Sequence, residues 1–385
     1  MLNADSPISK EKEEILRLKR ESVKKESEKL KNDWISPLIL KGSVQKSKSS
    51  VNSFSNSLTT AKNLSLSLNQ DIFRSGGIFY AVRYARSLGK SKLLSVDIQE
   101  ASILKKIYVL KAQIDRDRAK IEQAKLLLKN REIDVLVVKE KYKAGNADIA
   151  RLNGAVLEEE KAKENLVTLQ NALKNELYEI KKLIGDKDEK KISLIPFPLP
   201  SKEEYISKNL SLLSLKESSL ASKNRLKVTQ ASYLPKVYVN ADFGYSEYES
   251  SRFKREGKEY GYGIGFRIPF DYNSKNDIEV SRLEYLQKES ERKDKIRELE
   301  FEYEKRLSNI KSYEEKIKLS DKMISLYKEL YDFTKREVEA GFKTELELES
   351  LANSLKIEKL QKEIQKYNIL IEKANLYFDM QRGEK

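Results

Sequence analysis

Three glutamates close together are the strongest chemical signal in this chain. Glu345, Glu347 and Glu349 follow Ala340-Gly341-Phe342, where a long helical pattern stops and starts again. Acidic residues in the first turn of a helix stabilise it by interacting with the helix dipole. Carboxylates repeated around a symmetry axis would instead favour cations, as rings of carboxylates do in channels. The two interpretations are compatible, and the sequence does not choose between them.

Other residue patterns do not indicate catalysis. The chain has no cysteine and no histidine, which argues against thiolate nucleophiles, imidazole bases and the usual zinc sites. The glycines of Gly261-Tyr262-Gly263-Ile264-Gly265 suggest a phosphate-binding loop, but the spacing is incomplete and no helix follows directly. We therefore expect no catalytic residue, no metal ligand, no cofactor and no enzymatic activity.

The composition is typical of long helices with a large surface. Charged residues make up 35% of the 385 residues, while only 14 glycines and 7 prolines occur. The formal net charge of +14 predicts affinity for anionic surfaces. Lysine and glutamate alternate along the helical patterns, however, and no dense basic run includes aromatic residues, so we expect no nucleic-acid partner. No stretch approaches the roughly 20 apolar residues of a membrane-spanning helix.

The chain contains the same arrangement twice. Trp34-Ile35-Ser36-Pro37 and Ser232-Tyr233-Leu234-Pro235 each precede alternating apolar residues. Tyr142-Lys143-Ala144-Gly145 and Val338-Glu339-Ala340-Gly341 each interrupt a long helical pattern. Both pairs are offset by roughly two hundred residues, which indicates a duplicated unit of domain size rather than a short repeat. Each copy reads as helix, strand, strand, long helix, turn and long helix.

The strands have one apolar face and one polar or glycine-rich face. In the second copy the apolar face comprises Val237, Val239, Ala241, Phe243 and Tyr245 on one strand, and Tyr260, Tyr262, Ile264, Phe266 and Ile268 on the next. In the first copy the apolar face comprises Leu38, Leu40 and Val44 on one strand, and Leu64, Leu66 and Leu68 on the next. A Ser/Asn-rich loop at 47–59 joins these two strands. Strands of about ten residues with this alternation are typical of membrane barrels. The alternative is a sandwich strand with one solvated face.

The long helices keep heptad spacing. Apolar residues follow this repeat from Ile103 to Tyr142 and from Ile296 to Tyr331, which predicts coiled-coil packing over about 90 Å. The chain reverses at Ala144-Gly145-Asn146 and at Ala340-Gly341-Phe342. The proline-rich segment 195–200 predicts an extended linker, and Ser201 with Glu204 predicts a capping box.

Four strands cannot close a membrane barrel alone. An open sheet edge has unpaired backbone groups that lipid cannot satisfy. Two copies would give eight strands with a filled interior, and three copies would give twelve. Gly261, Gly263 and Gly265 on the inner face favour an open interior, so we expect a trimer.

These features together resemble the TolC-like outer-membrane efflux proteins, over residues 7 to 380. The resemblance rests on the ordered set of Phe73-Arg74-Ser75-Gly76-Gly77, Ala231-Ser232-Tyr233-Leu234-Pro235, Ile268-Pro269-Phe270 and the two helical turns. It implies an α+β, mainly helical fold whose trimer forms a 12-stranded membrane barrel continued by a helical tunnel. The expected regions are an N-terminal helix (1–33), a transmembrane hairpin (34–73), a helical hairpin (74–189), a linker with a helix (190–232), a second transmembrane hairpin (233–271) and a second helical hairpin (272–385).

The resemblance also implies a function and partners. It implies a passive exit duct for drugs or proteins in the outer membrane of a Gram-negative bacterium, extending into the periplasm, with a periplasmic adaptor and an inner-membrane transporter as partners and lipid around the barrel. Leu2-Asn3-Ala4 would then be the end of a removed signal peptide. The alternative function is a soluble periplasmic adaptor or scaffold, in which the strands would form a small domain.

Site residues carried over from the family lie at the two turns. Ala144, Gly145, Asn146, Ala340, Gly341 and Phe342 are expected to meet the adaptor. Glu347, with Glu345 beside it, matches the position of an acidic ring, and Lys343 matches a basic residue that ties the closed tip together. Arg151 departs from the family, which often has an acidic residue there. We expect Arg151 and Glu347 to lie at equivalent heights in a gate.

Overall fold

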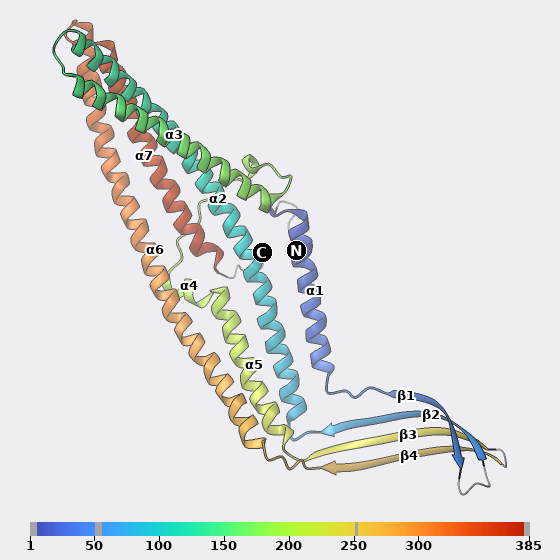
Figure 1. The fold of residues 1–385 in the computed structure, drawn as a ribbon. Coiled ribbons are helices and arrows are strands. Elements are labelled where there is room, and N and C mark those ends of the chain that lie inside the picture. Colours follow the sequence, from blue (N-terminus) through green and yellow to red (C-terminus); the bar gives the residue numbers. More distant parts are fainter. Residues whose placement is uncertain (1–5, 51–55, 251–252, 381–385) are drawn as a thin grey trace. The chain divides into compact units, whose positions relative to one another are not determined.

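The computed structural model describes residues 6–50, 56–250 and 253–380 (Figure 1). The elements in order are α1 (Lys10–Asn32), β1 (Ile39–Ser50), β2 (Asn56–Phe73), α2 (Gly77–Lys143), α3 (Ile149–Ile184), a short 3-10 helix η1 (Glu189–Lys191), α4 (Lys202–Ser207), α5 (Leu210–Ser232), β3 (Lys236–Ser250), β4 (Lys254–Arg267), α6 (Ser274–Glu339) and α7 (Glu345–Phe378). The predicted segment Leu2-Asn3-Ala4 and the middle of the predicted loop 47–59 lie outside the described residues.

The order of elements confirms the predicted fold class, mainly helical with two tandem repeats. The second copy was predicted to begin with one helix, but the structure has two, α4 and α5. Asn209 lies at the break and caps the start of α5, because its side-chain oxygen accepts hydrogen bonds from the backbone N–H groups of Ser211 and Leu212, at 3.1 and 3.2 Å. Its backbone also bridges to Met380. At Ser201 only half of the predicted capping box is formed, since Ser201 caps Glu204 without a return bond.

The described chain falls into two compact units. One comprises 1–18, 96–212 and 295–385, and the other comprises 19–95 and 213–294. The second unit contains the sheet, and the first contains both helical turns. Because each unit combines segments from both copies, neither copy folds as a separate domain.

The sheet is antiparallel throughout, in the order β1-β2-β3-β4. Its strands have 12, 18, 15 and 14 residues, so the prediction of about ten residues per strand was too short. The extra residues continue each hairpin with charged side chains, which pair across strands, as Lys62 and Lys254 do with Glu247 at 3.4 and 3.0 Å. Polar alternation extends a strand as readily as apolar alternation where water replaces lipid.

In the unit with the turns, polar contacts fix the register of long helices that share an apolar seam. Asn353 of α7 is buried and donates to Asn130 of α2 at 2.9 Å, while Asn130 donates to the carbonyl of Ser350. About two helical turns before Asn130 on α2, the side chain of Gln123 donates to that of Gln361 on α7 at 3.1 Å. A buried amide pair is satisfied in only one register, which is how a polar residue specifies coiled-coil alignment.

The predicted proline-rich linker is anchored in the core of the same unit. Phe197 is buried against Phe378 and Tyr108, with ring centroids 5.4 and 5.7 Å apart. The hydroxyl of Tyr303 donates to the carbonyl of Pro200 at 2.9 Å. The linker therefore contributes aromatic packing to the core as well as joining the two copies.

Candidate functional site: the sheet faces and the helical turns

The register places a continuous apolar face across all four strands. Leu40 pairs with Leu66, Leu66 with Phe243, and Phe243 with Tyr260, so one row of apolar side chains crosses the sheet. The face is uncovered: Tyr260 is 83% and Phe266 77% exposed. A face of this size left open to water would be a large exposed apolar patch, which signals a contact with lipid or another protein.

The apolar band has the height of a membrane interior. On β3 it runs from Val237 to Tyr245, which at about 3.4 Å per residue and a tilt of about 40° spans roughly 20–25 Å. Beyond Tyr245 the same face continues with Glu247 and Glu249. Where the sheet meets the helices, Phe270 and Tyr272 are fully exposed, as residues of an aromatic girdle would be.

The opposite face corrects the expectation that its three glycines leave open space. A Cβ atom on Gly261 would have no neighbour within 4 Å, but one on Gly265 would lie 2.5 Å from Cζ of Tyr238 on β3. One on Gly263 would lie 3.0 Å from the side-chain oxygen of Asn240. An aromatic ring that lies over a glycine on the next strand fills the missing side-chain volume and pins the register. Only Gly261 is therefore open.

Both helical turns have the same geometry. Gly145 and Gly341 have φ angles of 77° and 78°, which residues with a Cβ rarely adopt. The N–H of Asn146 donates to the carbonyl of Lys141 at 2.8 Å, and Phe342 makes the equivalent bond five residues back, also at 2.8 Å. This pattern terminates a helix and satisfies its last carbonyls. All six residues predicted to meet an adaptor are exposed: Ala144, Gly145, Asn146, Ala340, Gly341 and Phe342.

Glu347 has a local structural role. Thr344 is the N-cap of α7, and the two residues form a capping box: the Glu347 carboxylate accepts from the backbone N–H of Thr344 at 3.0 Å, and the Thr344 hydroxyl accepts from the N–H of Glu347 at 3.3 Å. The sequence pattern Thr344-Glu345-Leu346-Glu347 contains this capping-box signal, which the predicted roles of Glu347, a first-turn acid and a member of a pore ring, did not include. A carboxylate in this box still carries its charge, so a pore ring is compatible with the cap.

The structure places Arg151 at the position in α3 that Glu347 has in α7. Each is the third helical residue after its N-cap, and the backbone N–H of Arg151 donates to the Asp148 carboxylate at 2.8 Å. Within the described residues, the Arg151 guanidinium forms no ion pair. A cation in the first turn is disfavoured by the helix dipole. Local helix stability therefore does not explain why an arginine stands there.

Lys343 has a partner within the chain. Its ammonium lies 2.7 Å from the Glu337 carboxylate, and that contact, supported by the charge of Glu347, raises the pKa of Lys343. Glu349 pairs with Lys129 at 3.3 Å, so it is directed to α2. Glu345, the first residue of α7, is exposed. Single-chain contacts thus bring Lys343 and Glu347 near each other and leave Arg151 and Glu345 in solvent.

A second apolar stripe on α6 was missed by the heptad assignment. Its residues recur at alternating spacings of four and three and are all exposed: Leu319, Met323, Leu326, Leu330 and Phe333. The assigned seam, by contrast, includes the buried Ile310 and the half-buried Ile324 and Tyr327. Two stripes on one helix indicate two packing partners, and a single chain covers one of them. These residues also follow a heptad repeat, shifted relative to the assigned one, so the sequence contained a signal for this second stripe.

A buried pair of acids lies between α2 and α3. Desolvation, together with the nearby charge of Asp117, raises the pKa of Glu176 to about 7. Asp117 itself stays ionised, because hydrogen bonds from Arg116 and Lys120, at 2.8 and 2.9 Å, overcome its desolvation and lower its pKa. One oxygen of Glu176 is buried without a hydrogen-bond partner. Glu176 is therefore close to half protonated at neutral pH, next to an ionised Asp117.

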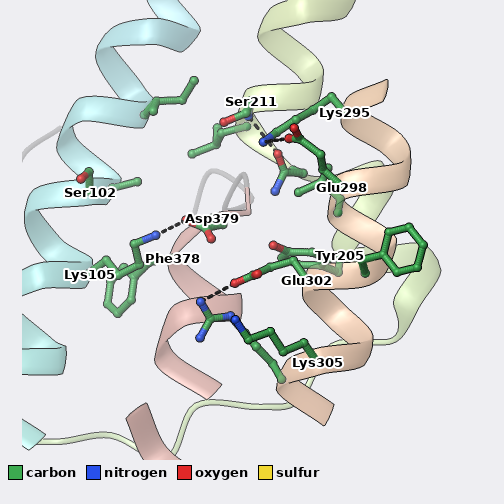
Figure 2. Close-up of a pocket in the computed structure, with 17 residues that line it drawn as sticks. Ser102, Lys105, Tyr205, Ser211, Lys295, Glu298, Glu302, Lys305, Phe378 and Asp379 are labelled. Atoms are coloured by element: carbon green, nitrogen blue, oxygen red, sulfur yellow. Dashed lines mark hydrogen bonds and ion pairs between the residues drawn. The ribbon is translucent and has the colours of Figure 1, made fainter. Parts of the chain in front are cut away.

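A cavity of about 700 Å³ in the unit with the turns is lined by paired charges (Figure 2). Lys105 lies 2.7 Å from Asp379, and Arg306 lies 2.5 Å from Glu302 and 2.7 Å from Glu372. Because these charges already have partners, none is poised as a general acid, base or nucleophile. The cavity ties the end of α7 to α2 and α6.

Comparison with known proteins finds a family that matches the second copy. Residues 203–378 match the family model described as "Outer membrane efflux protein", which covers the second copy with both its strands and both its long helices. The second copy of this chain is thus similar to the outer membrane efflux proteins, and the predicted recognition is confirmed over these residues.

Solved structures of outer-membrane channels have the same fold as this chain. VceC from Vibrio cholerae is 15% identical and aligns over 94% of this chain and 91% of its own, with a TM-score of 0.73. The CmeC channel from Campylobacter jejuni is 13% identical over 97% and 84%, with a TM-score of 0.70. The open-state MtrE channel from Neisseria gonorrhoeae is 13% identical over 95% and 85%, with a TM-score of 0.69. A comparison with curated proteins finds no match.

The described residues contain neither a helix suited to cross a membrane nor a cluster of metal-binding side chains. In residues 6–50, 56–250 and 253–380, no helix is long and apolar enough to cross a membrane. The same part of the chain has no group of three or more carboxylate, imidazole or thiol side chains placed to hold a metal ion.

Proposed function

We infer that three copies of this chain form a passive exit duct through the outer membrane. The observation that carries the proposal is the four-stranded sheet with an uncovered apolar face and two unpaired edges, β1 and β4. The unpaired backbone groups of either edge would be unfavourable in lipid, and pairing both edges with strands of further copies would give these groups hydrogen-bond partners. Twelve strands enclose a wider interior than eight, and the open face at Gly261 agrees with a water-filled lumen.

The second stripe on α6 supports the same trimer. Apolar residues from Leu319 to Phe333 would pack against a helical hairpin of the neighbouring copy, continuing coiled-coil packing around the ring. A soluble adaptor would need a compact β domain with a buried core. Among the strands of the described chain there is only one sheet, and its apolar face has no second layer.

The helical turns would dock a periplasmic adaptor, which in turn links the duct to an inner-membrane transporter. The turns expose small residues on a rigid, doubly hydrogen-bonded backbone, and a trimer would present six of them. The transporter supplies the energy, so the duct itself needs no catalytic group. Drugs and proteins are both compatible substrates of such a duct.

Reconstitution into planar bilayers tests the duct. Trimer purified in detergent should give long-lived, ohmic channel openings, and the Leu326→Lys variant, which charges the second stripe, should lose them together with the trimer. Absence of conductance from well-folded wild-type trimer would contradict a duct, and a Leu326→Lys variant that remains a conducting trimer would contradict the packing.

A further inference from the structure

A groove in the unit with the sheet has a strongly basic lining. It has a volume of about 620 Å³ and lies between α1, α2 and α5. Each helix contributes one face, because the lining residues recur at three, four or seven positions, as Lys24, Ser27 and Lys31 do on α1. Five cationic side chains line it, Lys24, Lys31, Arg83, Arg86 and Lys90, against two acidic ones, Glu28 and Glu217.

The cations are available for a ligand. Throughout the described ranges, Lys24, Lys31, Arg86 and Lys90 form no ion pair, whereas cations elsewhere on these helices do, as Lys92 does with Glu26 at 2.5 Å. Five positive charges against two negative ones leave an excess of positive charge around the groove, and this excess repels itself. An anion in the groove would reduce that repulsion.

The floor of the groove is polar and closely packed. Gly89 lets α1 approach α2, since a Cβ there would lie 2.8 Å from Cβ of Ser27. Ser87 and Asn224 are buried, and both line the groove. The Asn224 amide donates one hydrogen to the carbonyl of Leu220 at 2.9 Å, so its second N–H and the Ser87 hydroxyl are the floor donors that a phosphate oxygen could accept from, below the guanidinium and ammonium groups.

The groove begins close to the level where the membrane ends. Arg83 is six residues into α2, so it lies about 9 Å along the helix from the end of the sheet. Its guanidinium lies 4.6 Å from the ring centroid of Phe79, which is 56% exposed. Headgroups occupy about 5–8 Å on each side of the hydrocarbon core, and long basic side chains reach toward them. The groove is therefore within reach of phospholipid headgroups of the periplasmic leaflet.

We propose that this groove binds the phosphate group of an anionic phospholipid, with the lining cations nearest the sheet, Lys31, Arg83 and Arg86, as its main contacts. The inference rests on the outer-membrane position of the sheet and adds a ligand site to the duct. A phosphodiester with a second hydroxylated headgroup suits the site, because it offers oxygens to both the basic rim and the polar floor. A zwitterionic headgroup carries a positive charge that the five cations disfavour.

The test compares lipids retained by the detergent-purified trimer, measured by native mass spectrometry. The groove variant is Lys31→Gln with Arg86→Gln. The matched control is Lys29→Gln with Arg225→Gln, which removes the same charges from exposed positions on α1 and α5 outside the groove. Each cation near an anionic lipid contributes about fivefold in affinity, so the groove variant should bind phosphatidylglycerol about 25-fold more weakly. The wild type and the control should prefer phosphatidylglycerol to phosphatidylcholine.

Other outcomes overturn the proposal. Equal retention of phosphatidylglycerol by the groove and control variants places the lipid elsewhere, and equal binding of the two lipids by the wild type excludes recognition of the charge. Displacement of phosphatidylglycerol by equimolar inorganic phosphate makes the site one for free phosphate. If the groove variant does not fold, the test uses the wild type alone. Its preference for phosphatidylglycerol over phosphatidylcholine should weaken at high salt, and a preference that does not change with salt contradicts binding in the groove. Channel conductance is recorded in parallel, so failure of the duct is seen separately.

Discussion

Glu347 combines a helix cap with a proposed pore charge, and two substitutions separate the roles. Glutamine at 347 keeps an oxygen that can accept from the Thr344 N–H, now 3.0 Å from the carboxylate, but removes the charge. Lysine removes both. The cap contributes about 0.5–2 kcal/mol to the start of α7, so Glu347→Lys should loosen this turn and Glu347→Gln should not.

The size of the charge effect can be worked out for a water-filled pore. A permeating cation about 10 Å from one carboxylate gains about 0.4 kcal/mol in water, and three symmetry copies give about 1.2 kcal/mol. Glu347→Gln should therefore lower cation preference about eightfold while conductance stays close to the wild type. Glu347→Lys should reverse the preference and raise conductance, because it adds repulsion near Lys343 and Arg151.

Single-channel recordings in planar bilayers under a salt gradient measure both quantities. The double variant with Arg151→Glu should regain part of the closed conductance of the wild type, since opposite charges again face each other between neighbouring hairpins. If Glu347→Gln leaves the reversal potential unchanged, Glu347 acts only as a helix cap, and the proposed acidic ring is wrong.

Three further predictions concern other parts of the chain. Ile264→Arg should reduce insertion into the outer-membrane fraction, at a cost of about 2–4 kcal/mol near the bilayer centre, while Gly261→Arg should insert normally and lower conductance; equal insertion of both would contradict the assigned faces. Tryptophan at Gly145 and Gly341 should abolish export but keep the trimer, whereas asparagine, which tolerates positive φ, should retain export; normal export by the tryptophan variant would refute docking at the turns. Because the folded-state pKa of Glu176, about 7, exceeds its ordinary 4.5, stability should fall by about 1–2 kcal/mol as pH rises from 4.5 to 7; thermal unfolding of Glu176→Gln should lack this slope.

Features with a short sequence period were predictable. The alternation from Tyr260 to Phe266 fixed which side chains share a face, because successive residues of a strand point in opposite directions. The heptads around Ile310 located one helical seam for the same reason. Gly145 and Gly341 ended their helices where positive φ was needed. Each of these depends on residues within one or two turns of each other.

Features that depend on alignment between distant segments were not predictable. Tyr238 covers Gly265 only because β3 and β4 pair in one register. The pair Asn130 and Asn353 is more than two hundred residues apart in sequence, and single-sequence patterns do not indicate that their helices touch. The expected lumen glycines and the second stripe on α6 were misjudged for this reason: both required knowing which neighbour lies opposite.

The sheet with two open edges makes oligomeric mass the most direct measurement. Mass determination of the purified protein in detergent, by light scattering corrected for bound detergent or by native mass spectrometry, should give three chains. Recovery of that mass should fail without detergent, because the apolar face from Leu40 to Tyr260 would be exposed to water. A stable, detergent-free monomer would contradict the barrel and, with it, the duct.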